Sequence, residues 1–239
     1  MRTKLNVNID HVATLRQARQ GSFPDPIDTI KIIKKAKASG IVMHLREDRR
    51  HIQLNDLKKY RQKYNFHLNL EMAPTIEMIN IANIIKPNVV TLVPEKRMEL
   101  TTEGGLNIKN NYNDLQNLLK KISKDIKIMF FIDPIKLQID LALKLKAYGI
   151  EINTGKYSES TPSSVVKELN RIKKAAAYST ALNLYTAAGH GLNESNLAML
   201  VKIRDIKEYN IGHSIISNAI FYGLYDSIKR IQDIININD

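Results

Sequence analysis

Short β-type segments alternate regularly with longer helical segments through this whole sequence, and that alternation limits the folds the chain can adopt. Each short run is β-branched or alternates in polarity, and a run of helical periodicity follows it, eight times in all. Alternating strands and helices require a parallel sheet with right-handed crossovers. The predicted strand and helix pairs are 4–10 with 26–39, 41–45 with 54–64, 66–72 with 75–85, 88–94 with 112–123, 127–133 with 134–148, 150–154 with 162–182, 184–188 with 194–203, and 208–212 with 214–236.

Chain length decides between the two common parallel architectures. The 239 residues suit a closed (β/α)8 barrel, the TIM barrel, which takes about 250 residues. An open sheet that binds a dinucleotide is disfavoured because no Gly-x-Gly-x-x-Gly motif follows the first strand. We therefore predict one (β/α)8 domain over 1–239 with extra helical insertions, and a long functional loop over 95–111.

Local signals predict where some helices begin and end. Asp25-Pro26 and Thr161-Pro162 each resemble an N-cap residue followed by proline at the first helical position. Ser39-Gly40 resembles the end of a helix. The last helix, over 214–236, is predicted to be a single long element.

Composition excludes several classes of protein. No apolar run approaches the roughly 18 residues of a membrane span, and the N-terminal residues lack a signal-type apolar stretch, so we expect a cytoplasmic protein without membrane association. Cysteine is absent, which excludes disulfides and thiolate chemistry. The net charge of +12 suits nucleic-acid binding, but the lysines are scattered over helical segments, and we expect solvated helix faces and no nucleic-acid partner.

Five of the six histidines fall at or just past the C-terminal end of a predicted strand, which is the face on which barrel enzymes build their active sites. The sixth, His67, lies at the start of a strand. One such histidine is most often structural, but five at one rim favour a functional site. The five are His11, His44, His51, His190 and His213.

Alternation within the strands predicts which side chains line the mouth of the barrel. Helices cover the outside of a barrel, so the apolar face of each strand points outward and the polar face inward. Burying many polar groups costs several kcal/mol unless they pair or bind a ligand, so the mouth is either a self-satisfied polar plug or a binding site. The predicted inward set is Asn8, Asp10, His44, Arg46, Glu71, Glu151 and His190.

Two regions of the rim suit phosphate groups. Residues 212–214 join the last strand to the last helix beside 189–191, so backbone N–H groups and a positive helix end can meet an anion there. Residues 46–51, rich in arginine, and 101–105, with two threonines, form the second region. Two regions suggest two phosphorylated ligands, although Arg49 and Arg50 are equally explained as surface ion-pair formers, the interpretation that we favour for these two.

A metal-dependent barrel hydrolase is a second enzyme class that these residues allow. Its ligands would be His44, Glu71, His190 and His213, since imidazole and carboxylate groups on one rim suit zinc or manganese. Loss of activity in a chelator, restored by metal, distinguishes this class from metal-free chemistry.

Seven motifs occur in order along nearly the whole chain: NIDH at 8–11, HLREDRRH at 44–51, NLEM at 69–72, VPEKR at 93–97, TTEGGL at 101–106, AGHGL at 188–192 and NIGH at 210–213. Together they closely resemble the pyridoxine 5′-phosphate synthase family of vitamin B6 synthesis. The resemblance implies condensation of 3-amino-2-oxopropyl phosphate with 1-deoxy-D-xylulose 5-phosphate to pyridoxine 5′-phosphate, phosphate and water. It implies no metal and no cofactor, and a homo-octamer.

The resemblance also implies roles for individual residues. His44 and Glu71 resemble general bases, His190 a proton donor and Glu151 a stabiliser of charged intermediates. Contacts with the aminoketone phosphate are implied for Asn8, Arg19, Gly191, Gly212 and His213. Contacts with the pentulose phosphate are implied for Asp10, His11, Arg46, His51 and Thr101.

Three positions depart from the family pattern. Asn153 replaces a usual histidine, Ala187 replaces an asparagine and Glu194 replaces a tyrosine. None has an implied catalytic role, but the departures leave open how Glu151 and His190 are hydrogen-bonded.

Overall fold

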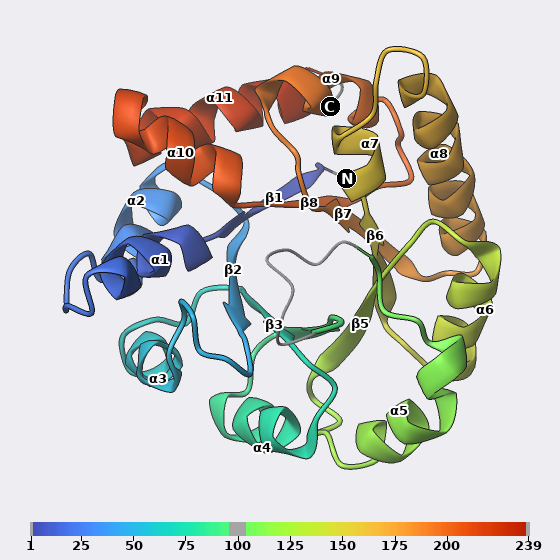
Figure 1. Cartoon of the computed structure of the whole chain (residues 1–239), viewed down its shortest axis with the longest axis horizontal. Helices are drawn as coiled ribbons and strands as arrows, with labels where there is room; N and C mark the ends of the chain where they lie inside the picture. The colour runs from blue at the N-terminus through green and yellow to red at the C-terminus, as the bar shows by residue number, and fades with distance from the viewer. Residues whose placement is uncertain (1, 96–103, 238–239) are drawn as a thin grey trace.

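The computed structural model describes residues 2–95 and 104–237. Its eight strands form a closed parallel barrel in which each strand pairs with the next one along the chain and β8 pairs with β1. Helices surround this ring of strands on all sides (Figure 1). The predicted (β/α)8 TIM barrel is therefore confirmed.

All eight predicted strands are present, and further helices occur between them. The strands are β1 Lys4–Asn8, β2 Gly40–Leu45, β3 Leu68–Met72, β4 Val89–Leu92, β5 Lys127–Ile132, β6 Gly149–Asn153, β7 Tyr185–Gly189 and β8 Glu208–Ile211. The helices are α1 Asp10–Ala18, α2 Thr29–Lys35, α3 Leu54–Lys63, α4 Ile76–Ile85, α5 Tyr112–Leu119, α6 Lys136–Lys144, α7 Gly155–Ser158, α8 Val165–Ala181, α9 Glu194–Leu200, α10 His213–Tyr222 and α11 Leu224–Asn236, with short 3-10 helices η1 Pro26–Asp28 and η2 Lys109–Asn111.

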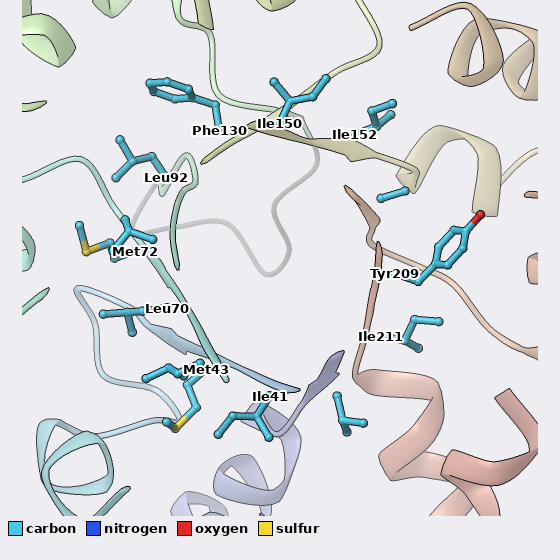
Figure 2. Packing of buried hydrophobic residues seen from close by; sticks show 14 of the residues in the cluster. Ile41, Met43, Leu70, Met72, Leu92, Phe130, Ile150, Ile152, Tyr209 and Ile211 are labelled. Atoms are coloured by element: carbon cyan, nitrogen blue, oxygen red, sulfur yellow. The ribbon is translucent and has the colours of Figure 1, made fainter. Parts of the chain in front are cut away.

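The main hydrophobic core lies between the strands and the surrounding helices. Apolar strand residues such as Ile41, Leu70 and Ile150 point away from the barrel axis into this layer and are fully buried (Figure 2). Each such side chain contributes roughly 1.5–3 kcal/mol when it leaves water. Among the described helices, none has the length and apolar character needed to cross a membrane.

Polar side chains line much of the barrel interior, as the strand alternation predicts, beside a small apolar cluster of Val89, Met129 and Ala187. Asn6 Nδ2 donates to Asn210 Oδ1 over 3.2 Å, and Asn210 Nδ2 donates to Glu151 Oε2 over 2.7 Å. On the opposite side Thr91 Oγ1 donates to Asn69 Oδ1 over 2.8 Å. The outward core therefore stabilises the fold, while the interior remains available for polar chemistry.

The first strand-to-helix connection differs from the prediction. The sequence pattern does not predict α1, which begins directly after β1 and is held by an ion pair of 2.7 Å between Arg16 and Asp56 of α3. Asp25 does cap the next element, with its side chain accepting from the N–H of Ile27 over 3.0 Å, but that element is η1, and α2 ends at Lys35.

Two predicted helix boundaries are wrong. Gly40 does not end a helix but begins β2, where a Cβ would lie 2.7 Å from the His67 ring, so glycine is needed for close strand packing. Pro162 does not begin a helix either, because 161–164 form a turn and α8 begins at Val165.

The last predicted helix is two helices. Gly223 has a φ of +78°, a left-handed conformation that favours glycine, and it ends α10 and precedes α11. This break lets α11 pack against α10, α9 and α2 (Figure 1). The α10 helix is therefore a short element of the barrel rim that begins at the mouth.

Candidate active site

A cavity of about 410 Å³ opens at the C-terminal end of the barrel, where the predicted rim residues meet. All five rim histidines lie in or beside it, and His67 lies at the opposite end, as predicted. The sequence-predicted residues that line the cavity are Asn8, His11, His44, Glu71, Glu151, His190, Gly191, Gly212 and His213.

His44 lies between two carboxyl groups. Its Nε2 is 2.7 Å from Oε1 of Glu95, and its Nδ1 is 3.8 Å from Oε2 of Glu71. His44 and Glu71 are register partners on β2 and β3, so the barrel itself fixes their separation. Nε2 of His44 is therefore hydrogen-bonded to Glu95, while the separation between Nδ1 and Glu71 is too long for a direct hydrogen bond.

The environment of Glu71 favours its neutral form. Burial raises the pKa of Glu71 well above its ordinary value, and the negative charges of Glu151, Asp10 and Glu95 raise it further. Glu71 therefore carries a proton at a pH where an exposed glutamate is ionised. A carboxyl group with a raised pKa in a cleft is typical of acid–base catalysis.

Glu95 has the opposite protonation preference. Burial alone would raise the pKa of Glu95. A hydrogen bond from His44 and one of 2.8 Å from the N–H of Glu47 outweigh burial, so the pKa of Glu95 lies below its ordinary value. An ionised and a neutral carboxyl group thus face the same imidazole. The sequence analysis considered residues at strand ends and missed Glu95, which it assigned to the loop after β4. The signal that could have found it is an acidic residue shortly after the end of a strand.

Asp10 joins the ends of β1 and β2 beneath this row. One carboxylate oxygen accepts from the backbone N–H of His44 and the other from Asn8 Nδ2, both over 2.8 Å. Burial raises the pKa of Asp10 to about 6, although the positive charges of His44 and Arg46 act against it. Asp10 lies outside the cavity wall and positions the groups that line it.

His51 is held as a neutral imidazole next to His44, with the ring centroids 5.8 Å apart. Its Nδ1 accepts from the N–H of Ile52 over 2.9 Å, which leaves an Nε2–H as a donor. Burial lowers the pKa of His51 to about 3, and the charges of His44 and Arg46 lower it further. His51 is therefore suited to donating a hydrogen bond to an anion.

Glu151 lies on the far side of the interior and is 2 % exposed. Burial raises the pKa of Glu151 to about 8 against the effect of the hydrogen bond from Asn210. Gly189 on β7 is needed here, since any Cβ at that position would overlap the Glu151 carboxyl group. The sequence pattern does not show this packing role of Gly189.

The backbone determines where the His190 side chain lies. His190 has a φ of +84° and Gly191 a φ of +73°, so two successive residues adopt the left-handed region, which is strained for histidine. The buried Thr154 Oγ1 holds this turn by donating to the carbonyls of Gly189 over 2.7 Å and His190 over 2.6 Å. Burial lowers the pKa of His190.

The predicted phosphate turn lies at the start of α10. Gly212 precedes the helix, His213 is its first residue, and the His213 ring meets that of His11 edge-on with centroids 4.9 Å apart. A Cβ at Gly212 would lie 2.7 Å from Asn8 Cβ, so this glycine is required for the close approach of β8 to β1. The first-turn N–H groups of α10 border the cavity, as an anion site requires.

The second predicted anion region is only partly described. Arg46 is buried and lies 3.1 Å from Asp48, which also binds Arg50 over 2.7 Å, while Arg49 binds Glu77 over 2.5 Å. The ion-pair interpretation of Arg49 and Arg50 is therefore confirmed. The use of Arg46 and its neighbours by a phosphate remains a prediction, and Thr101 lies outside the described residues.

The remaining predicted contact, Arg19, lies away from the cavity, and the three departures from the family pattern have partners of their own. Arg19 is exposed at the end of α1 and does not line the cavity. Asn153 Nδ2 donates to Asp133 over 2.9 Å, and Ala187 packs inside the barrel with Val89 and Met129. Glu194 forms an ion pair of 2.9 Å with Arg230. In the described residues none of the three departures forms a hydrogen bond or ion pair with the His190 or Glu151 side chain, although Ala187 is the register partner of Glu151.

The metal ligands proposed for a hydrolase do not cluster as a set. In the described part of the chain, the group with metal-ligand spacing is Asp10, His44 and His51, whose ligand atoms lie within 4.8 Å of one another. Hydrogen bonds already occupy both oxygens of Asp10 and Nδ1 of His51. These donors therefore fit a metal poorly.

Two solved structures with low sequence identity share this fold. A thiamine phosphate pyrophosphorylase from Pyrococcus furiosus is 13% identical with a TM-score of 0.61, covering 99% of this chain and 96% of that one. A tryptophan synthase A-subunit from Pyrococcus furiosus is 8% identical with a TM-score of 0.62, covering 97% and 98%.

Sequence comparison is more specific. A relative from Sulfurihydrogenibium sp. (strain YO3AOP1), named pyridoxine 5′-phosphate synthase, is 50% identical over 97% of both chains. A second of that name, from Thermodesulfovibrio yellowstonii, is 48% identical over 97% of this chain and 96% of its own length. The family model described as "Pyridoxal phosphate biosynthesis protein PdxJ" matches residues 5–237. The chain therefore belongs to the pyridoxal phosphate biosynthesis protein PdxJ family.

Proposed function

We propose that this protein condenses 3-amino-2-oxopropyl phosphate with 1-deoxy-D-xylulose 5-phosphate and releases pyridoxine 5′-phosphate, inorganic phosphate and water. The observation that carries the proposal is the row Glu71, His44 and Glu95 at the mouth, in which neutral and ionised carboxyl groups flank one imidazole. Relatives that cover the whole chain carry the name of this activity.

The reaction consists of steps that need proton transfer. Joining the amine to a ketone, expelling water and phosphate, and closing the ring each move protons between carbon, nitrogen and oxygen atoms. His44 and Glu71 act as bases on one wall. Because the pKa of Glu71 is raised, its carboxylate is a stronger base than an ordinary glutamate, and its carboxylic acid can return the proton.

The opposite wall supplies the proton donor and a charged support. His190 donates a proton to a leaving oxygen from its fixed position after β7. Glu151 stabilises cationic intermediates such as a protonated imine when its carboxyl group is ionised. Several groups that titrate at different pH values on two walls suit a reaction with several proton transfers.

Two phosphate sites complete the proposed assignment. The aminoketone phosphate binds at the start of α10, with Asn8, Gly191, Gly212 and His213, and with Arg19 as the contact that the structure does not place at the cavity. The pentulose phosphate binds with His11, Arg46, His51 and Thr101, and with Asp10 behind the cavity wall; His11 lies against His213, so the two phosphate sites adjoin there. The free first-turn N–H groups of α10 and the Nε2–H of His51 support this division.

We also propose that the enzyme works in the cytoplasm, where its charged substrates are retained. We propose further that it is a homo-oligomer, an octamer as the resemblance implies. The end of α10 supports self-association. Ile220, Phe221 and Tyr222 are 72, 78 and 50 % exposed and adjacent. Such an apolar patch is typical of a surface that binds a partner.

A product assay tests the proposal. The purified protein is mixed with both substrates, and pyridoxine 5′-phosphate is measured by mass spectrometry, with each substrate omitted in turn as control. We expect product only when both substrates are present, at the same rate with and without EDTA. No product would overturn the proposal, and product formation that EDTA abolishes and added metal restores would favour metal-assisted chemistry at Asp10, His44 and His51.

A further inference from the structure

A second cavity lies at the N-terminal end of the barrel, opposite the active site. Its volume of about 430 Å³ is similar to the 410 Å³ of the mouth. Its walls include residues at the starts of five strands or just before them: Lys4, His67, Val89, Lys127 and Tyr185. The mechanism uses none of these residues. The size is within the range of small-molecule sites.

The cavity wall carries an excess of positive charge. Lys4, Arg61, Lys86 and Lys127 line it, and among the described residues none of these four forms an ion pair with a carboxylate. The wall contains two acidic residues. Asp125 is exposed, and burial raises the pKa of Glu208 against the effect of the nearby Lys4, so four cations face two carboxyl groups. The charges therefore favour an anionic occupant.

Aromatic rings hold two of the ammonium groups in place. Tyr148 and Tyr185 stack with centroids 5.2 Å apart and an interplanar angle of 24°. Lys127 Nζ lies 4.3 Å from the centroid of Tyr148, and Lys4 Nζ lies 5.4 Å from that of Tyr185. A cation–π contact positions an ammonium group without neutralising it, so its N–H donors remain available.

His67 lines the same cavity and carries a polar atom without a partner. Its Nε2 is buried and has no hydrogen-bond partner, and its ring packs against Gly40 at the start of β2. A buried polar atom without a partner costs roughly 1–3 kcal/mol, so a ligand atom that pairs with it is favoured. Burial lowers the pKa of His67 to about 4, and the nearby charges of Lys4 and Lys127 contribute to this shift.

We propose that the N-terminal cavity is a second ligand site that binds the phosphate group of a small anionic molecule between Lys4, Lys127 and His67. A doubly charged phosphate group matches the excess of cations better than a single carboxylate does. The stacked tyrosines provide an apolar wall for the remainder of a phosphate monoester. The site is separate from the two phosphate positions of the mouth, since it lies at the other end of the strands.

The histidine distribution provides a reporter for this site, because five histidines surround the mouth and His67 alone lies at the N-terminal end. The protein is labelled at histidine, the His67 imidazole signal is assigned by its loss in His67→Gln, and inorganic phosphate is titrated in. We expect the His67 signal to shift and its pKa to rise, because a bound anion offsets the charges of the two lysines.

Paired lysine variants test the assignment. In Lys4→Gln/Lys127→Gln the affinity read at His67 should weaken at least about tenfold, while phosphate shifts at His213 stay unchanged. Lys173→Gln/Lys174→Gln on the exposed face of α8 removes the same charge and should leave the His67 titration as in the wild type.

Two further probes identify the source of the phosphate group. If pyridoxine 5′-phosphate binds more tightly than inorganic phosphate, the ligand is a phosphate monoester. If the two bind similarly, the ligand is the free phosphate ion. Pyridoxine without a phosphate group should not bind. An unchanged His67 signal with both phosphate compounds overturns the proposal, as does a shift that survives loss of both lysines. Because the readout is binding and not turnover, this result is independent of the product assay.

Discussion

The two walls of the mouth hold their reactive groups by different means. On the β2–β3 wall, His44 is held by contacts with the side chains of Glu71 and Glu95. On the β6–β7 wall, His190 is held through its backbone, by a left-handed turn and by Thr154. Charge substitutions should therefore alter the protonation of the first wall, and substitutions that alter the turn should displace the group on the second.

The largest effect is expected from Glu71→Gln, which keeps the shape of the side chain and removes the base. Turnover should fall by about 10² or more, the range expected for loss of a general base. Steady-state kinetics measure this, with Glu77→Gln on the exposed face of α4 as the matched control. Near-normal turnover of Glu71→Gln would exclude this residue as a base.

His190→Asn tests the backbone-held wall and should lower turnover by about 10² while the protein stays folded. Asparagine tolerates a positive φ better than most residues, so the turn should be kept while the proton donor is lost. Kinetics and thermal unfolding are measured on the same sample. A large fall in the unfolding temperature would instead indicate a structural histidine.

Glu95→Gln should lower turnover by about tenfold and shift its pH dependence. A negative charge at Glu95 raises the pKa of Glu71, so its removal lowers that pKa. If Glu71 acts as a base, activity rises as the pH increases through its pKa, and the acidic limb of the kcat/KM profile should move to lower pH. An unmoved limb, or one displaced to higher pH, would contradict the coupling.

The smallest effect is expected from Thr154→Val, which removes the hydroxyl donor to two carbonyls at nearly constant volume. Stability should fall by about 1–2 kcal/mol and turnover by a few-fold, because the His190 turn loses its support. Denaturant unfolding and kinetics measure the two effects. Thr154→Ser, which keeps the hydroxyl, should restore both, and failure to do so would point to lost packing.

Much of this site could be predicted because its residues follow strand ends. Period-2 alternation predicts that His44, Glu71 and Glu151 point inward, and the closed barrel then brings them to one mouth. The junction between the last strand and the last helix adds Gly212 and His213. The alternation within each strand was sufficient to predict these residues. In a barrel, a residue near the C-terminal end of any strand lies near the mouth, so side chains at equivalent positions of neighbouring strands meet there.

The rest depended on contacts that no local pattern contains. The carboxylate of Glu95 reaches His44 of β2 from the loop after β4, and the hydrogen bond to His44 helps to lower its pKa. The Glu151 carboxyl group lies where a side chain at Gly189 would start, and the His67 ring lies where one at Gly40 would start, which explains why both positions are glycine. The break at Gly223 needs a left-handed φ that helical periodicity does not reveal.

The central claim is that the β2–β3 wall carries out proton transfer with Glu71, His44 and Glu95 as one row. Nitrogen-15 NMR of histidine-labelled protein at neutral pH tests it most directly, with the His44 signal assigned by His44→Gln. The account predicts an Nε2 that carries a proton in a short hydrogen bond and an Nδ1 that is free to accept one, with the Nε2 signal altered in Glu95→Gln. A His44 protonated at Nδ1 alone, or a signal insensitive to Glu95→Gln, would contradict it.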